Sequence, residues 1–173
     1  YANVDGFNFS EEEIPVSQRP EIDRWILSEL NSLIQEVVDG MDSFEPTRAF
    51  RAIQNFTTEY LSNWYVRLCR RRFWKGSYEF DKIAAYQTLY TCLETVAKLG
   101  APLAPFFMDR LFMDLNEVTG KDKVQSVHLS DFPVSDKSLI DESLEERMEA
   151  AQQMSSMVLS LRQREKIKVR QPL

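Results

Sequence analysis

The sequence predicts an all-α fold, a helical bundle of about five main helices. Apolar residues recur at spacings of three and four along five stretches of the chain, which is the period of an amphipathic helix. Prolines and glycines separate these stretches at positions where helices commonly begin and end. A chain of 173 residues with 43% hydrophobic and 12% aromatic residues is also long enough to bury the core of one ordinary domain.

The boundaries of the five helices follow from where the apolar spacing starts and stops. The expected helices cover, in chain order, residues 20–40, 46–76, 80–99, 102–120 and 141–163. Proline suits the first position of a helix, and glycine suits the residue that follows the last. Asp141 is the expected cap of the fifth helix, because Glu142, Glu145 and Glu146 follow it and carboxylates favour the positive end of a helix dipole. The second helix is expected to be the longest, with roughly eight turns at about 3.6 residues each.

Three segments lack this helical period. Residues 1–19 are acidic and irregular, and we expect a linker that leads into a bundle covering residues 20–163. Residues 124–129 alternate weakly between polar and apolar side chains, which predicts a short extended segment across one end of the bundle. Residues 166–170 alternate basic and apolar side chains, which is typical of a strand, so residues 164–173 are expected to begin a following region. We expect residues 166–173 to be poorly ordered or to pair only with a neighbouring molecule. Because a lone strand is unstable and the first residue is not methionine, we expect the chain to be a piece of a longer protein.

Residues that the chain lacks disfavour several classes of function. No apolar run approaches the roughly 18 residues of a membrane-spanning helix, and no signal segment follows the first residue. Cys69 and Cys92 lie far apart within helical patterns, which fits neither a disulfide framework nor a zinc site. His128 is the single histidine, which excludes a His-based metal site and disfavours a His-based catalytic triad. We therefore assign no catalytic residue, no metal and no cofactor to these 173 residues.

The charge of the chain is unevenly distributed. The formal net charge is -6, yet residues 60–75 contain five basic residues and no acidic one. Residues 162–170 contain five basic residues and one acidic residue. An acidic body with two concentrated basic segments is typical of a surface that attracts one polyanion at defined places. Two solvated helix faces would produce the same composition, and this alternative stays open.

The first basic segment forms an ordered face when it is drawn as a helix. At about 100° per residue, one face roughly 100° wide holds what we call the arginine ridge: Asn63, Arg67, Arg70, Arg71 and Trp74. The opposite face is expected to be core and holds Leu61, Tyr65, Leu68, Cys69 and Phe73. Guanidinium groups bind phosphates through two parallel hydrogen bonds, and an exposed indole offers a stacking surface to a base. The arginine ridge therefore suits an RNA backbone and an unstacked loop base.

Neighbouring residues fit this projection less simply. Arg72 falls within the core face, so we expect it to pair with an acidic residue rather than with RNA. Trp64 falls near the edge of the ridge, which fits either the core or an RNA contact. Phe56 and Tyr60 fall on the arginine side, which predicts that the helix bends there or is covered by another element. In the alternative interpretation, the arginine ridge pairs with carboxylates elsewhere in this acidic chain.

Four stretches of the sequence resemble one family in their order and spacing. They are residues 63–67 (Asn-Trp-Tyr-Val-Arg) with the three arginines at 70–72, residues 102–106 (Pro-Leu-Ala-Pro-Phe), residues 126–129 (Ser-Val-His-Leu) with Phe-Pro at 132–133, and residues 168–173 (Lys-Val-Arg-Gln-Pro-Leu). Together they resemble the anticodon-binding domain of isoleucyl-tRNA synthetases of class Ia, and the resemblance covers the chain from about Arg19 onward. The third stretch is shared with valyl and leucyl enzymes, so the equivalent domain of those enzymes is an alternative. The arginine helix and the terminal stretch favour isoleucine.

The resemblance implies a domain that binds the anticodon stem and loop of an isoleucine tRNA. It implies a parent enzyme that attaches isoleucine to this tRNA with ATP and magnesium, as a monomer in the cytoplasm and away from membranes. The implied RNA-contacting residues are Asn63, Trp64, Arg67, Arg70, Arg71, Trp74 and Lys75. The nucleotide-binding signatures of the class, His-x-Gly-His and Lys-Met-Ser-Lys-Ser, do not occur in the chain, so catalysis is expected in the rest of the parent synthetase. The competing class is a helical protein-interaction module whose arginine ridge docks an acidic partner.

Overall fold

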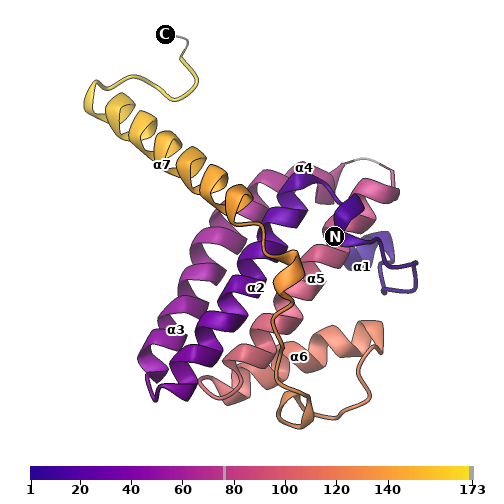
Figure 1. Cartoon of the computed structure of the whole chain (residues 1–173). Coiled ribbons are helices and arrows are strands. Elements are labelled where there is room, and N and C mark those ends of the chain that lie inside the picture. The colour runs from indigo at the N-terminus through magenta and orange to yellow at the C-terminus, as the bar shows by residue number, and fades with distance from the viewer. Residues whose placement is uncertain (76, 172–173) are drawn as a thin grey trace. The chain divides into compact units, whose positions relative to one another are not determined.

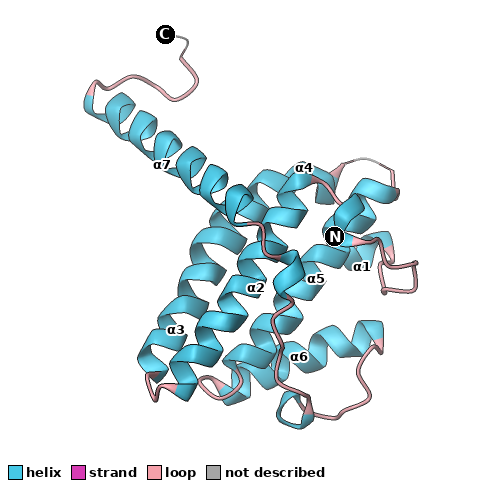
Figure 2. Ribbon diagram, viewed as in Figure 1, coloured by secondary structure: helices cyan, strands magenta, loops and turns pink. Residues whose placement is uncertain are grey.

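All regular structure in the described residues is helical. The computed structural model describes residues 1–75 and 77–171 (Figure 1), and Figure 2 shows helices and loops without a strand in them. Residues Tyr1–Ile140 form one compact unit, and residues Asp141–Leu173 form a second. The predicted all-α fold is confirmed.

The helices of the two units match the five apolar stretches of the sequence. The first unit contains α1 (Ala2–Asp5), η1 (Val16–Gln18), α2 (Glu21–Asp42), α3 (Pro46–Asn55), η2 (Phe56–Val66), α4 (Arg67–Trp74), α5 (Phe80–Gly100), α6 (Pro105–Thr119), η3 (Val127–Leu129) and η4 (Lys137–Leu139), and the second contains α7 (Glu142–Arg164). Of the elements labelled η, η2 is a π-helix and the others are short 3₁₀-helices. The predicted domain boundaries after residues 19 and 163 stay predictions.

The first two main helices form a hairpin in which Gly40 lies inside α2. Helix α2 ends at Asp42, two residues after the glycine near which we expected it to stop. Gly40 is buried, and a Cβ atom added to it would lie 3.3 Å from the backbone nitrogen of Ala49. The absent side chain therefore lets α3 approach α2 closely, as the adjacent ribbons in Figure 1 illustrate.

The second expected helix is the longest helical run in the described residues. The chain stays helical from Pro46 to Trp74, because α3, η2 and α4 follow one another without a break. Gly76, where we expected this helix to end, lies outside the described residues. We call the run from Pro46 to Trp74 the long helix.

The core of the first unit lies between α2, the long helix and α5. Its largest fully buried side chains include Trp25 from α2, Phe56 and Tyr65 from η2, and Leu99 from α5. Burial of such aromatic and aliphatic side chains is the main stabilising contribution to a bundle of this kind. It also determines which side of the long helix remains in contact with solvent.

The segment that leads into the bundle is attached to α5. Residues 1–19 contain the short helices α1 and η1, whereas we expected an irregular linker. Asp5 accepts a hydrogen bond of 2.7 Å from the ammonium group of the buried Lys82. The buried guanidinium group of Arg19 donates to the hydroxyl of Thr88 at 3.0 Å. These contacts satisfy polar groups that α5 would otherwise bury without a partner.

The segment between α6 and η3 closes one end of the first unit. Within residues 124–129 the expected extended conformation was wrong for Val127–Leu129, which form the 3₁₀-helix η3. Val127 is buried and packs in one cluster with Phe112 of α6. The carboxylate of Asp109 accepts hydrogen bonds from the hydroxyl of Ser126 (2.7 Å) and from the N–H of Val127 (2.9 Å). The packing of Val127 and the hydrogen bonds to Asp109 stabilise this segment without the partner strand that an extended segment would need.

The second unit consists of α7 and the turns that follow it. The Oδ1 atom of Asp141 accepts the N–H of Leu144 at 3.0 Å, which confirms the expected cap. Residues 165–171 form turns, in which the N–H of Ile167 donates to the carbonyl of Arg162 at 2.8 Å. The expected strand does not form in the described part of this tail, since a single strand has no partner there.

Candidate nucleic-acid interface

The long helix presents the arginine ridge to solvent. Its five residues are all exposed, with Asn63 on η2 and Arg67, Arg70, Arg71 and Trp74 on α4. Lys75, directly after α4, is exposed as well, and Trp64 is partly buried. The candidate residues therefore lie along about 18 Å of one helix, at 1.5 Å per residue. Their contact with RNA stays a prediction.

The buried side of the long helix accounts for this orientation. Its buried residues form a single row: Ala49, Ile53, Phe56, Leu61, Tyr65, Cys69 and Phe73. The step of five residues from Phe56 to Leu61 falls within η2, where each hydrogen bond spans one more residue than in an α-helix. The wider turns return Phe56 to the core, although a uniform α-helix would place it on the arginine side. The expected bend or cover near Phe56 is thus a change of helix type.

Leu68 is the residue of the predicted core face that the structure leaves outside the core. Its side chain is 54% exposed, so its expected burial was wrong. Leu68 lies one residue before Cys69 and therefore about 100° away from the buried row. Trp64 has the equivalent place before Tyr65 and is only partly buried. Its position fits both alternatives, since the ring contributes to packing and still reaches solvent.

Arg72 points inward and forms a bidentate ion pair. Its two terminal nitrogens donate to the two carboxylate oxygens of Asp23 at 2.7 and 2.8 Å, and Nη2 also lies 3.0 Å from the carboxylate of Asp81. Asp23 is fully buried, and the hydroxyl of Tyr65 donates to it at 2.7 Å. Burial lowers the pKa of Arg72, but the hydrogen bonds and charge of Asp23 more than offset it and raise that pKa overall. The expected pairing of Arg72 with an acid is confirmed.

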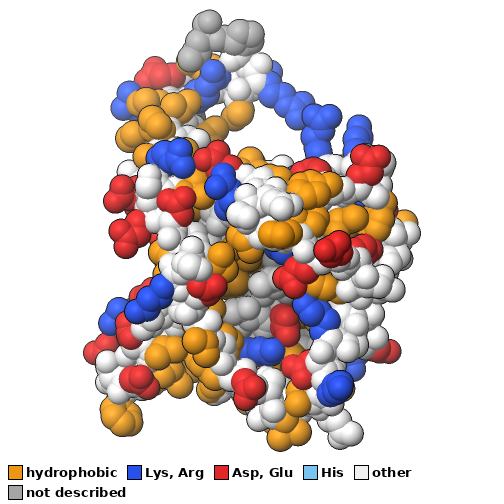
Figure 3. All heavy atoms as spheres, turned by 45° about the vertical axis from the view of Figure 1, so that its right-hand side comes forward, with side chains coloured by type: hydrophobic (Ala, Val, Ile, Leu, Met, Phe, Trp, Pro, Cys, Tyr) orange, Lys and Arg blue, Asp and Glu red, His pale blue; other side chains and the backbone are white. Residues whose placement is uncertain are grey.

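The other basic residues of this segment have no acidic partner. Arg67, Arg70, Arg71 and Lys75 form neither ion pairs nor side-chain hydrogen bonds with residues 1–75 or 77–171. The alternative in which the arginine ridge pairs with carboxylates of this chain is therefore wrong across the described part. By contrast, acidic and basic side chains are interspersed over the face that Figure 3 shows. Unpaired guanidinium groups on one helix side remain available to an anionic ligand.

Trp74 lies at the end of the arginine ridge among groups that also favour stacking. The guanidinium carbon of Arg70 is 5.1 Å from the centroid of the indole, a cation–π arrangement. The ring of Tyr1 lies 6.0 Å away at an angle of 39°. The indole remains 50% exposed, so a base can reach it. The sequence pattern contained no signal for Tyr1, because its place depends on the docking of α1 against α5.

Asn63 takes part in the only acidic contact of the arginine ridge within the described residues. Its side-chain nitrogen donates to the Oε2 atom of Glu59 at 3.1 Å, one helical turn earlier. The interaction is exposed, so it holds the amide only weakly. The amide therefore remains free to exchange this partner for a nucleotide.

No catalytic centre is evident in the residues that the structure describes. They contain no group of three or more His, Cys, Asp or Glu side chains placed to hold a metal ion. Burial raises the pKa of the Cys69 and Cys92 thiols, which disfavours the reactive thiolate. His128 is exposed, and its backbone N–H donates to the hydroxyl of Ser126 at 3.2 Å. None of the described helices is both long enough and apolar enough to cross a bilayer.

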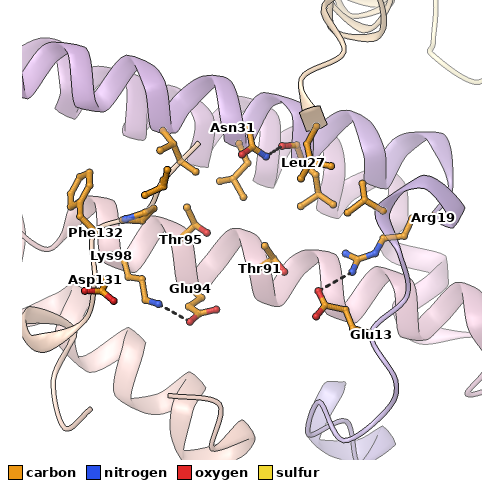
Figure 4. A pocket seen from close by; sticks show the side chains of 16 residues that line it. Glu13, Arg19, Leu27, Asn31, Thr91, Glu94, Thr95, Lys98, Asp131 and Phe132 are labelled. Carbon is orange, nitrogen blue, oxygen red and sulfur yellow. Dashed lines mark hydrogen bonds and ion pairs between the residues drawn. The ribbon is translucent and has the colours of Figure 1, made fainter. Parts of the chain in front are cut away.

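A hollow of about 420 Å³ lies between α2, α5 and the segment around residues 131–134. Figure 4 shows two pairs of charged side chains along it, Lys98 with Glu94 and Arg19 with Glu13. Lys98 is 3.0 Å from the carboxylate of Glu94 on the same helix, and Arg19 is 3.7 Å from Glu13. Because these charges already have partners, the hollow is better explained by packing than by ligand binding.

Comparison with known proteins identifies relatives over the whole chain. A family model described as the anticodon-binding domain of tRNA ligase matches residues 23–173. The isoleucine–tRNA ligase of Cytophaga hutchinsonii is 63% identical over 173 residues, which are all of this chain and 16% of that protein. The proteins of the same name from Bacteroides thetaiotaomicron and Thermus thermophilus are 58% and 40% identical over the same length, at 15% and 16% of those proteins. The chain thus spans about one sixth of the length of these relatives.

Proposed function

The chain belongs to the family of anticodon-binding domains of tRNA ligases, and from this premise we propose that it binds the anticodon stem and loop of an isoleucine tRNA. The proposed contacts are Asn63, Trp64, Arg67, Arg70, Arg71, Trp74 and Lys75. In this arrangement the arginines hold backbone phosphates, and Trp74 stacks on an unpaired loop base. The choice of isoleucine rests on the relatives named above, which are isoleucine–tRNA ligases.

One observation carries this proposal: the arginines of one helix segment divide into two roles. Arg72 is neutralised by the buried Asp23, whereas Arg67, Arg70 and Arg71 have no carboxylate partner among the described residues. A chain with a net charge of -6 has ample acid to pair with them. Their unpaired state on the solvent side therefore supports a role for an external polyanion.

The remaining properties of the longer protein are proposed with this function. The parent would attach isoleucine to its tRNA in the cytoplasm with ATP and magnesium, at a site outside these residues. We expect the parent to act as a monomer and this domain to bind no cofactor itself. The domain would supply RNA binding and the parent would supply the chemistry.

Titration of an anticodon-arm hairpin of an isoleucine tRNA against this 173-residue chain tests the proposal. If about three arginines each neutralise one phosphate, the plot of log affinity against log salt should have a slope of roughly -2 to -3. Arg67→Ala and Arg71→Ala should each weaken binding and flatten that slope by about one contact. The matched control is Arg110→Ala, because Arg110 is exposed on α6 and pairs with Asp114 at 2.8 Å.

Unchanged hairpin affinity in both Arg67→Ala and Arg71→Ala would overturn the assignment of the arginine ridge to RNA. It would favour the competing class, a protein-interaction module that docks an acidic partner. The chain could instead bind the anticodon arm of a valine or leucine tRNA as tightly as that of an isoleucine tRNA. This result would support tRNA binding but would overturn the assignment to isoleucine.

A further inference from the structure

The turn between α2 and α3 exposes an aromatic side chain on a strained backbone. Phe44 has a φ of 57°, the left-handed region in which a side chain with a Cβ atom costs about 1–2 kcal/mol relative to ordinary helical backbone. Its N–H donates to the carbonyl of Met41 at 3.1 Å, so the residue closes the end of α2. Glycine is the residue that usually occupies this position. Phenylalanine therefore does not stabilise the backbone conformation of this turn.

The side chain of Phe44 brings no advantage to packing either. It is 92% exposed, so it contributes almost nothing to the core. An exposed aromatic ring on a backbone that disfavours it is best explained by a contact with another molecule. Such a ring offers a flat apolar face to a nucleobase, as Trp74 does at the opposite end of the long helix.

The surface beside Phe44 continues the basic character of the long helix. A hollow of about 620 Å³ at this turn is lined by Phe44 together with Arg48, Arg51 and Asn55 of α3. Arg51 is exposed and forms no ion pair or hydrogen bond with any described residue. Arg48 pairs with Glu36 at 3.5 Å between two half-exposed side chains, and such surface pairs are weak and easily exchanged.

Acidic residues are nearly absent from this helix. Residues 46–75 contain seven basic residues and a single acidic one, Glu59, in a chain with a net charge of -6. Glu36 and Glu45 also line the hollow, so the local attraction for an anion comes mainly from Arg51. The exposed basic residues of α3 and of α4 lie on the same side of the long helix, the side in contact with solvent. The reason is that η2 aligns the buried residues of α3 and α4 in a single row on the opposite side. Figure 1 shows the α2–α3 turn and α4 at opposite ends of that helix.

We propose that Phe44, Arg48, Arg51 and Asn55 form a second RNA-binding subsite, in which Arg51 holds a backbone phosphate and Phe44 stacks on an unpaired base. We call it the turn subsite, and it rests on the function proposed above. Within the turn subsite, Arg51 lies roughly 24 Å from Arg67 along the helix, at about 1.5 Å per residue. One RNA bound along the solvent side of the long helix would contact both places. An RNA is favoured over an acidic protein because the subsite combines a free guanidinium group with an exposed ring, the two groups that bind a nucleotide's phosphate and base.

The test uses a complete isoleucine tRNA transcript, titrated against the whole chain at several salt concentrations. Arg51→Ala should weaken binding severalfold and flatten the salt slope by about 0.7–0.9, the contribution of one phosphate. Phe44→Gly should weaken binding about five- to one-hundredfold without a change of slope, because stacking releases no counterion. The same Phe44→Gly variant should raise the melting temperature by roughly 2–4 °C, since glycine removes the strain. A gain in stability together with a loss of affinity distinguishes a binding role from damage to the fold.

Two variants serve as matched controls. Phe106→Gly removes another exposed phenylalanine, on α6, where the side chain is 90% exposed. Arg110→Ala removes an exposed arginine from the same helix. Neither should change the affinity for the transcript. A loss of affinity in these controls as large as in Phe44→Gly and Arg51→Ala would overturn the turn subsite.

Failure of the turn subsite and failure of the proposed function give different results. If Phe44→Gly and Arg51→Ala bind the transcript like the wild type while Arg67→Ala binds weakly, the subsite is overturned and the proposed function stands. If Arg67→Ala and Arg71→Ala also bind like the wild type, both are overturned. A polyglutamate peptide is the probe for an acidic protein partner. If it binds as tightly as the transcript, and Phe44→Gly and Arg51→Ala abolish that binding, the turn would be assigned to an acidic protein instead.

Discussion

Arg72 and Arg71 are neighbours with the same side chain in opposite surroundings. The guanidinium group of Arg72 is held by the fully buried Asp23, which also accepts a hydrogen bond from Tyr65. Arg71 is exposed and has no partner among the described residues. A step of one residue rotates a helical side chain by about 100°, so adjacent arginines can serve structure and binding respectively.

Loss of Arg72 should therefore destabilise the fold and leave RNA contacts intact. Arg72→Ala leaves the Asp23 carboxylate buried without its cation, which should lower the free energy of unfolding by about 3–5 kcal/mol. For a chain of this size the melting temperature should fall by roughly 10 °C. Calorimetry measures this shift, with Arg71→Ala as the control that should melt near the wild type. Equal melting temperatures for the two variants would contradict the division of roles.

Trp74 should contribute to RNA affinity through stacking rather than charge. Trp74→Ala should weaken hairpin binding by about 1–3 kcal/mol and leave the salt slope unchanged, because an indole releases no counterion. Trp74→Phe should retain part of the affinity, since it keeps an aromatic face. A flattened salt slope in Trp74→Ala would indicate that the ring acts by placing Arg70, whose guanidinium lies 5.1 Å from it.

At the scale of elements, η2 determines what the long helix offers to solvent. The π-helix inserts the five-residue step that keeps Phe56 and Leu61 in one buried row. Without it, α3 and α4 would turn different sides towards the core, and their basic residues would not share the solvent side. Wide turns of this kind are frequent at functional sites, and here η2 itself carries Asn63 and Trp64.

The contact between α6 and η3 should make the fold sensitive to acid. Hydrogen bonds from the hydroxyl of Ser126 and the N–H of Val127 hold the pKa of Asp109 below its ordinary value of 3.8. A carboxyl whose pKa is lowered by folding stabilises the native state above about pH 4, and this contribution is lost as the pH falls through the native pKa. Asp109→Asn should therefore melt below the wild type at pH 6.

The pH dependence of melting separates this effect from a general packing defect. As the pH falls below about 4 and through the lowered pKa of Asp109, the wild type should lose its advantage over Asp109→Asn, since protonation removes the same charge that the substitution removes. Glu117→Gln is the control, because Glu117 is exposed on the same helix and its side chain forms no ion pair or hydrogen bond with any described residue, and it should melt like the wild type throughout. A constant offset for Asp109→Asn would show that its charge does not hold η3.

At the scale of the whole molecule, we expect the chain to bind RNA without catalysing a reaction of its own. The two nucleotide-binding signatures of class I synthetases do not occur in its sequence, and its buried thiols have raised pKa values. The chain should therefore catalyse no isoleucine-dependent exchange between ATP and pyrophosphate. Isotope exchange with highly purified protein measures this, and a longer isoleucine–tRNA ligase is the positive control. Exchange above background that persists through repeated purification would place a catalytic site within these residues.

The sequence by itself determined the features that depend on near neighbours. The five apolar stripes, the cap at Asp141 and the inward direction of Arg72 follow from spacings of three or four residues. The direction of side chains in a helix repeats every three to four residues. A sequence pattern with the same spacing therefore predicts which side chains face the core without knowledge of the fold. The exposure of Arg67, Arg70, Arg71 and Trp74 was predictable for the same reason, because α4 is a regular α-helix.

Tertiary structure alone decided the features that depend on distant parts of the chain. Gly40 lies within α2 because Ala49 packs against it, and η3 replaces an extended segment because Val127 packs with Phe112. The ring of Tyr1 reaches Trp74 across more than seventy residues of sequence. Helix type and helix length depend on packing against other elements. The propensities and the periodicity of one segment carry no information about that packing. The π-helix is the clearest case, since its extra residue per turn moved Phe56 from the predicted arginine side into the core.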